Sequence, residues 1–249
     1  MKEFIYSRNA VYETLRAKRR HPFSLEIAEG VKEKGRLSEI IQLAKERKIP
    51  IKRVPRGRLE RLKANHQGVA LEVSGYPYAD ETDIFELAEE RGEPLFVLLL
   101  DSLNDPQNFG TLLRTAEVVG VHGVVIPLAR TVGVTPAVVN ASSGASEHLL
   151  VAQSNLSQAI TALKDSGAWV IGLEGSEQAE SPDKVRLDGA IGLVVGSEGE
   201  GMRPLTAKSC DILMKLPMKG QIESLNAAVA GSVALYLAYL ARNRDPKGL

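Results

Sequence analysis

The chain has little of several residue types that define whole classes of protein. Its 249 residues include one cysteine, Cys210, so an intrachain disulfide is impossible. That cysteine and the four scattered histidines have no metal-ligand spacing, so no metal is expected. No apolar run reaches the roughly 20 residues that cross a bilayer, and the N-terminus has no apolar signal core. These absences predict a cytoplasmic protein with no structural metal and no membrane partner.

Familiar nucleotide-binding motifs are also missing. Glycines at 196, 199 and 201 follow an apolar run, but they form neither GxGxxG nor a P-loop with GK[ST]. A nicotinamide-dependent or nucleoside-triphosphate enzyme is therefore not supported. Aromatic residues make up only 5% of the chain, and few lie among its basic residues. If the protein binds nucleic acid, contact with phosphates is expected more than stacking on bases.

Charge is divided unequally along the chain. The overall net charge is zero, but residues 1–67 carry a net charge of +10 and the remainder a net charge of −10. Such asymmetry suggests different partners for the two parts, and a basic module of this size suits a polyanion such as RNA. A solvated basic surface with no partner is the simpler alternative.

The hydrophobic pattern predicts an α/β protein with two domains. In residues 1–76, strands are expected at 23–29, 49–54 and 68–74, with helices at 7–20, 35–48 and 57–64. Residues 77–93 are acidic, contain one short helical pattern and are interpreted as a linker.

From residue 94 to 249, near-continuous apolar strands alternate with helices. Strands are expected at 95–101, 123–127, 168–173, 190–196 and 211–217. Strands without polar alternation are buried on both faces, which predicts a parallel sheet covered by helices. Ligands of such sheets bind beyond the carboxyl ends of the strands.

Two polar residues in 108–116, NFGTLLRTA, are candidates for chemistry. Asn108 stands near a helix start, where capping is the commonest use of asparagine. Arg114 would ordinarily lie on the solvated face of that helix. Its apolar neighbours Leu112, Leu113 and Ala116 make an arginine costly there and favour a specific role.

Three further candidates lie in glycine-rich or strand–loop–helix segments. Glu198, in the glycine turn, is either an exposed acid or a positioned hydrogen-bond acceptor. Ser224 is a possible helix cap. Asn226, one step inside an otherwise apolar helix, is harder to explain by capping, because a buried amide needs partners.

Together these segments resemble a known family. NFGTLLRTA (108–116), GSEGEGM (196–202) and LPMKGQIESLNAAVA (216–230), in this order, resemble the three motifs of the SpoU/TrmH family. Its members are S-adenosylmethionine-dependent RNA ribose 2′-O-methyltransferases of the SPOUT superfamily. The resemblance covers about 95–242. Residues 1–76, ending in NHQGVALEVS, resemble the L30e-like substrate-binding domain of the 23S ribosomal RNA guanosine branch.

The resemblance implies a catalytic domain at 94–249 with a deep trefoil knot. Arg114 would be the central catalytic residue, and the 2′-hydroxyl and cofactor loop would be oriented by Asn108, Glu198, Ser224 and Asn226. S-adenosylmethionine would contact Gly196, Gly201, Leu216, Met218 and Leu225. The helix 225–240 would contribute to a homodimer, whose active site would take residues from both subunits. An ordinary core helix is the alternative for that segment.

Other functions remain open at this level. Within the family, the alternatives are a transfer-RNA ribose methyltransferase and an antibiotic-resistance ribosomal RNA methyltransferase. Outside it, a non-catalytic RNA-binding protein would keep the fold without the chemistry, although the full set of candidate residues argues against that. An adenine-nucleotide-binding metabolic enzyme is disfavoured by the missing phosphate motifs.

Overall fold

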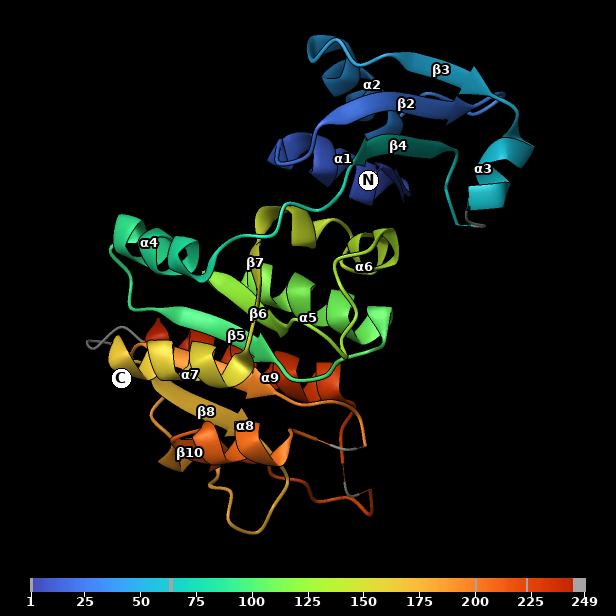
Figure 1. Cartoon of the computed structure of the whole chain (residues 1–249). Helices are drawn as coiled ribbons and strands as arrows, with labels where there is room; N and C mark the ends of the chain where they lie inside the picture. Colours follow the sequence, from blue (N-terminus) through green and yellow to red (C-terminus); the bar gives the residue numbers. More distant parts are fainter. Residues whose placement is uncertain (1, 63–64, 200, 223, 244–249) are drawn as a thin grey trace. The chain divides into compact units, whose positions relative to one another are not determined.

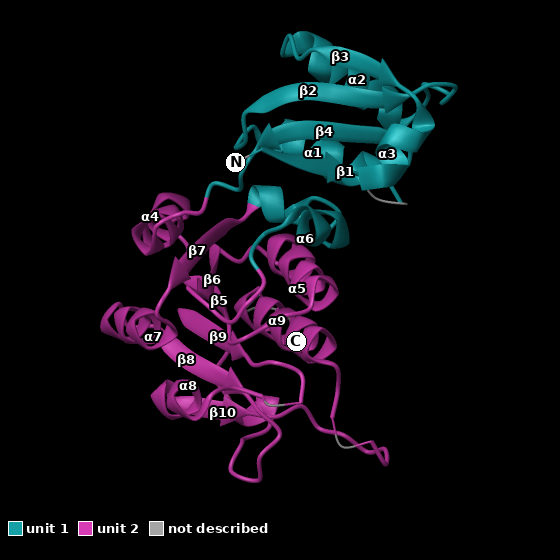
Figure 2. Ribbon diagram, turned by 45° about the vertical axis from the view of Figure 1, so that its right-hand side comes forward, with its two compact units in different colours: residues 1–77, 133–148 teal, residues 78–132, 149–249 magenta. Residues whose placement is uncertain are grey.

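The computed structural model describes residues 2–62, 65–199, 201–222 and 224–243, which form two compact units. Unit 1 comprises Met1–Pro77 and Gly133–His148, and unit 2 comprises Tyr78–Val132 and Leu149–Leu249 (Figure 2). Unit 1 is therefore discontinuous in sequence, a feature that the hydrophobic pattern did not reveal.

Unit 1 is built on a four-stranded sheet with the order β1-β4-β2-β3. Its strands are β1 (Lys2–Tyr6), β2 (Pro22–Ala28), β3 (Ile51–Val54) and β4 (Val69–Ser74). Its helices are α1 (Arg8–Ala17), α2 (Arg36–Glu46), α3 (Arg56–Leu62), α6 (Pro136–Ala141) and the 3-10 helix η1 (Ala145–His148). The three strands and three helices predicted in residues 1–76 are confirmed. The first strand, β1, was missed because it is a short edge strand that begins with the charged residues Lys2 and Glu3.

A buried ion pair joins the inserted segment to the rest of unit 1. Arg20 donates from Nε and Nη2 to the two carboxylate oxygens of Glu147, each at 2.9 Å, and from Nη1 to Glu3 at 2.6 Å. The side chains of Arg20 and Glu147 are both fully buried. The ring of Tyr76 lies 5.1 Å from the guanidinium, and its hydroxyl donates to the carbonyl of Ser146. Segment 133–148 is thus held by polar contacts as well as by apolar packing.

Unit 2 contains a parallel six-stranded sheet with the order β10-β8-β9-β5-β6-β7. Its strands are β5 (Phe96–Leu100), β6 (Gly123–Pro127), β7 (Leu150–Ser154), β8 (Trp169–Leu173), β9 (Ile191–Val195) and β10 (Ile212–Met214). The parallel sheet and five of these strands are confirmed. The sixth, β7, was missed because it is an edge strand whose Gln153 and Ser154 interrupt the apolar pattern.

Helices cover both faces of this sheet. They are α4 (Glu81–Arg91), α5 (Pro106–Val118), α7 (Leu156–Asp165), α8 (Pro204–Ser209), α9 (Ala227–Arg242) and the 3-10 helix η2 (Pro182–Lys184). Figure 2 shows α5 and α9 on one side of the sheet, with α4, α7 and α8 on the other. Because Ile84 and Ala88 of α4 belong to the hydrophobic core of unit 2, the segment 77–93 contains a packed helix of that unit.

The sheet order brings together strands that are far apart in the chain. β5 lies in the middle of the sheet, between β6 and β9, and Figure 1 shows it beside β6. The expected trefoil knot stays a prediction, since residues 200 and 223 of its two segments lie outside the described residues. In the described part of the chain, every helix is too short or too polar to cross a membrane.

Candidate active site

A large cavity of unit 2 lies beyond the carboxyl ends of β8 and β9. Its volume is about 680 Å³, within the range that small-molecule and cofactor sites occupy. Three segments form its walls: 173–176 at the end of β8, 195–199 with 201–202 at the end of β9, and residues of 215–230 that lead into α9. Strands of a parallel sheet all end at one edge, so loops from distant parts of the chain meet there.

The glycine turn after β9 is a tight hairpin. Ser197 and Gly201 exchange two backbone hydrogen bonds, of 3.0 and 3.1 Å. Gly199 and Gly201 have φ angles of 83° and 68°, which favour glycine. A Cβ on Gly196 would overlap with the backbone of Gly201 and Met202. Gly196 is therefore required by the return of its own chain, and it also lines the cavity.

Asn226 connects three parts of the site. Its side-chain Oδ1 accepts from the N–H groups of Ala228 and Val229, at 3.0 and 3.1 Å, so Asn226 is the N-cap of α9. Its Nδ2 donates to Asn108 Oδ1 at 3.1 Å and to the Glu198 carboxylate. Both amide protons and the amide oxygen of Asn226 are thus engaged.

The helix starts differ from those that the sequence predicted. α9 begins at Ala227, so the cap is Asn226, and Ser224 lies before the helix. α5 begins at Pro106 and is capped by Asp105, whose carboxylate accepts from the N–H groups of Gln107 and Asn108. The side chain of Asn108 is therefore available for Asn226.

Most of the predicted site residues lie together. The cavity is lined by all five predicted cofactor residues and by three predicted catalytic residues: Gly196, Gly201, Leu216, Met218, Leu225, Glu198, Ser224 and Asn226. Asn108 adjoins this set through its hydrogen bond to Asn226. Arg114 is not a lining residue; it lies on the exposed face of α5, with Gln107 and Thr111.

The cavity also has a wall that the sequence did not predict. Glu174, Gly175 and Ser176 follow β8, and Lys215 lies opposite, donating to the carbonyl of Ser176 at 3.2 Å. The Oγ of Ser176 is buried and has no hydrogen-bond partner among the described residues. A buried hydroxyl without a partner is costly and fits a site that a polar ligand completes. The only feature of the sequence that could have indicated this wall is the position of residues 174–176 directly after a predicted strand.

A buried carboxylate fixes the segment that follows the glycine hairpin. Asp101, at the end of β5, is fully buried and accepts from the backbone N–H of Arg203 at 2.9 Å and from its Nε at 2.7 Å. Because Arg203 directly follows Met202 in the chain, these bonds also help to hold Met202 at the wall of the cavity. Burial raises the pKa of the nearby Cys210 thiol to about 12, so this thiol stays protonated at neutral pH and provides no nucleophile.

Unit 2 is an α/β ligand-binding domain, because its parallel sheet has a glycine hairpin and a cofactor-sized cavity at its carboxyl edge. Its family follows from the similarity of the sequence to known protein families. Residues 95–236 match the SpoU rRNA Methylase family. Residues 4–79 match the family of RNA 2′-O ribose methyltransferase substrate-binding domains. The chain belongs to the SpoU methylase family and is an RNA 2′-O-ribose methyltransferase.

Similar proteins cover nearly the whole chain. YacO of Bacillus subtilis (strain 168), assigned to the TrmH family of tRNA/rRNA methyltransferases, is 43% identical over 99% of this chain and 98% of its own length. A TrmH family member of Staphylococcus aureus (strain COL) is 41% identical over 96% of each chain.

Solved structures share the fold. The SpoU methyltransferase AviRb from Streptomyces viridochromogenes, in complex with AdoMet, has a TM-score of 0.78 at 20% identity, covering 97% of this chain and 90% of that one. An AdoMet-bound rRNA methyltransferase from Sinorhizobium meliloti has a TM-score of 0.77 at 19% identity, covering 95% of this chain and 86% of its own. The predicted α/β fold and family are thus confirmed.

Proposed function

We propose that this protein transfers a methyl group from S-adenosylmethionine to the ribose 2′-hydroxyl of a guanosine in 23S ribosomal RNA. The observation that carries the proposal is the cavity beside Asn226, in a chain with an RNA substrate-binding domain. Ribosomal RNA as the substrate would also make the protein cytoplasmic.

The cavity fits the cofactor in size and in chemistry. Leu216, Met218 and Leu225 give it apolar walls, and the side chains of Met218 and Leu225 are each 45% exposed. The Oγ of Ser176 and the backbone of 196–199 and of Gly201 would provide polar groups for a nucleoside. When bound, S-adenosylmethionine supplies a methyl group whose carbon–sulfur bond breaks as the ribose oxygen attacks.

The protein's own residues would align the ribose and stabilise charge. Alignment of two bound reactants accounts for much of the rate in such a displacement. Asn226 holds Asn108 and Glu198 in one cluster at the mouth of the cavity, where Ser224 also lies. Arg114 would grip a substrate phosphate and stabilise the developing alkoxide with its positive charge, and the proton of the 2′-hydroxyl would pass to solvent water.

A second copy of the chain would complete the site. Four side chains that follow one stripe of α9 are between 42% and 55% exposed: Val229, Val233, Tyr236 and Leu240. An exposed apolar stripe of this kind favours a protein interface. α9 contacts α5, where the hydroxyls of Thr115 and Ser232 lie 2.9 Å apart. A partner on α9 would therefore lie near the helix that carries Arg114.

Unit 1 would bind the RNA by its charge. Its carboxylates are largely paired with arginines, as in Arg58–Glu26, Arg36–Glu39 and Arg20–Glu147. Exposed lysines that make no ion pair within the described residues include Lys18, Lys32, Lys34 and Lys48. The net positive charge is therefore carried mainly by lysines, which suit sequence-independent phosphate contact.

Labelled-methyl transfer tests the function directly. The full chain is incubated with radiolabelled S-adenosylmethionine and total RNA that lacks the modification, and the labelled nucleoside is mapped. Label on a 2′-O-methylguanosine of 23S RNA is expected. Label on transfer RNA would show that the substrate is transfer RNA and not ribosomal RNA. Binding of RNA without transfer of a methyl group would show that the protein is a non-catalytic RNA-binding protein.

A further inference from the structure

A second cavity of unit 2 lies apart from the cofactor cavity. Its volume is about 380 Å³, and its residues come from 127–130 after β6, 154–157 at the start of α7, and 203–206 at the start of α8. No described residue lines both cavities, but Met202 lines the first and Arg203 the second. The two cavities therefore lie on either side of one short segment that Asp101 holds in place.

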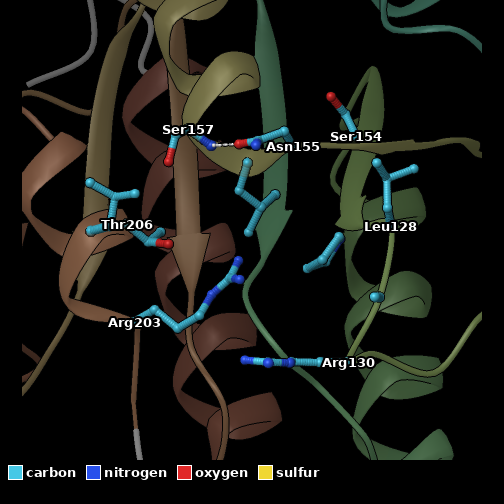
Figure 3. A pocket seen from close by; sticks show the side chains of 11 residues that line it. Leu128, Arg130, Ser154, Asn155, Ser157, Arg203 and Thr206 are labelled. Atoms are coloured by element: carbon cyan, nitrogen blue, oxygen red, sulfur yellow. Dashed lines mark hydrogen bonds between the residues drawn. The ribbon is translucent and has the colours of Figure 1, made fainter.

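Two arginines make this second cavity suitable for an anion. Figure 3 shows the nitrogen-bearing ends of Arg130 and Arg203 facing the same space. Asp101 engages Nε of Arg203 at 2.7 Å, and the terminal nitrogens of Arg203 have no partner among the described residues. Arg130 makes no ion pair within the described part of the chain. Paired guanidinium groups are well suited to a phosphate, which accepts several hydrogen bonds at once.

The backbone at Arg130 is held in an uncommon conformation. Its φ angle is 60°, in the left-handed region that residues other than glycine seldom adopt. The next two residues fix this conformation: Thr131 Oγ1 and the Val132 N–H both donate to the carbonyl of Leu103, at 2.8 and 2.9 Å. Such a conformation persists only where surrounding contacts hold it, so these bonds keep Arg130 in place beside the cavity.

Apolar side chains at the same cavity suit a nucleobase. Leu128 is 71% exposed and Leu205 is 66% exposed, which is unusual for leucine, and both line the cavity. Asn155 Oδ1 caps α7 by accepting from the N–H groups of Ser157 and Gln158, which leaves its Nδ2 for a ligand (Figure 3). Apolar faces beside arginines and an amide donor match an unstacked RNA base with its phosphate.

We propose that this cavity binds a nucleotide of the RNA that flanks the methylated one, with its base against Leu128 and Leu205 and a phosphate on Arg130 and Arg203. The inference rests on RNA being the substrate, and it adds a site outside the cofactor cavity. Its role is to fix the position of the strand, so it should act on RNA binding rather than on the transfer step.

The test compares Arg130→Gln with Arg186→Gln. Both remove one exposed positive charge from unit 2, but Arg186 pairs with Asp188 and does not line the cavity. For R130Q, the KM for RNA should rise about tenfold, kcat should change less than twofold and cofactor affinity should stay the same. R186Q should match the wild type. Equal KM values for both variants and the wild type would overturn the proposal, and absence of methylation by the wild type would instead overturn the proposed function.

A second experiment identifies the bound nucleotide. Single abasic substitutions are placed along a short RNA substrate, on each side of the methylated ribose, and binding is measured with the wild type and with L128A/L205A. One flanking position should weaken wild-type binding about tenfold, and this loss should disappear in L128A/L205A. A loss of the same size in both proteins would show that the base does not contact the two leucines.

Discussion

The side-chain amide of Asn226 donates to Asn108 Oδ1 at 3.1 Å while its oxygen caps α9. One side chain thus serves both helix stability and the order of the site, and the two roles can be separated by mutation. Serine caps helices about as well as asparagine, but it lacks the two amide protons.

Asn226→Ser should therefore lose at least about a hundredfold in kcat, while its melting temperature stays near that of the wild type. Asn226→Ala should lose the activity and also about 1 kcal/mol of stability, because the cap is removed. Methyl transfer and thermal unfolding measured on the same samples check both effects. Full activity of N226S would show that Asn226 is only a cap.

The hairpin at Gly196 offers a test of the cofactor cavity. Gly196→Ala would push a methyl group into the backbone of Gly201 and displace the hairpin, so affinity for S-adenosylmethionine should fall at least about tenfold. Gly175→Ala is the control, since Gly175 lines the same cavity but has open space where its Cβ would lie. Calorimetric titration measures both variants. Equal losses would mean that the cavity does not depend on the hairpin.

Mixing two inactive variants tests whether the active site is shared between subunits. If Arg114 of one subunit serves the cavity of its partner, a heterodimer of R114A and N226S contains one intact site. Subunits that exchange freely should then recover about a quarter of the wild-type activity, because half of the dimers are mixed and each has one working site. No recovery, despite subunit exchange detected by fluorescence, would place Arg114 and Asn226 in the same subunit's site.

His122 predicts how stability depends on pH. Its ring is buried: Nδ1 accepts from the Phe96 N–H at 3.0 Å, and Nε2 lies 3.1 Å from the Glu93 carboxylate. Burial, together with Arg91, lowers the pKa of His122 below its usual 6.5. As pH falls below about 6.5, unfolded histidine takes up a proton that the folded protein does not. Protonation of His122 thus favours unfolding. The free energy of unfolding should therefore decrease as the pH decreases.

His122→Asn isolates this effect, because its Oδ1 can still accept from Phe96 but does not titrate. Urea midpoints of the wild type should decrease between pH 7.5 and 5.5 by more than those of the variant. Parallel curves would assign the pH dependence to other groups.

Removing only one member of the Arg20–Glu147 ion pair should strongly destabilise the folded protein. Arg20→Met leaves Glu147 buried without its partner, and removing one member of such a pair costs about 3–5 kcal/mol. The double variant R20M/E147M should recover most of that loss, since an apolar pair can replace a buried ion pair. Urea unfolding of the three proteins measures this. If the double variant were as unstable as R20M, the loss of stability in R20M would not be caused by the unpaired carboxylate of Glu147.

The fold was predictable where the pattern is local and strong. The central strand 95–101 has no polar residue before Asp101, and the structure has β5 there. The misses have one physical cause, which is that edge strands need less apolar surface. β1 and β7 both lie at sheet edges and contain charged or polar residues, so the apolar pattern did not reveal them.

The site was predictable from motifs but not in its geometry. The motif residues that line the cavity were found because their sequence resembles a family's. The partnership of Asn226 with Glu198 could not be found in this way, because it depends on where β9 ends relative to α9. Ser176 was missed for a similar reason: a lone serine after a strand has no distinctive pattern, and its importance appears only once its buried hydroxyl is seen without a partner among the described residues.

The inserted segment 133–148 changes how the protein can be dissected. A fragment that ends near residue 76 lacks Glu147, so Arg20 would remain buried or become exposed without that partner. The complementary fragment would carry α6 and η1, and their buried side chains Val138 and Val139, which the rest of unit 1 now covers, would become open to water. The proposed binding of RNA by unit 1 is therefore better tested by substituting exposed lysines in the intact chain than by truncating it.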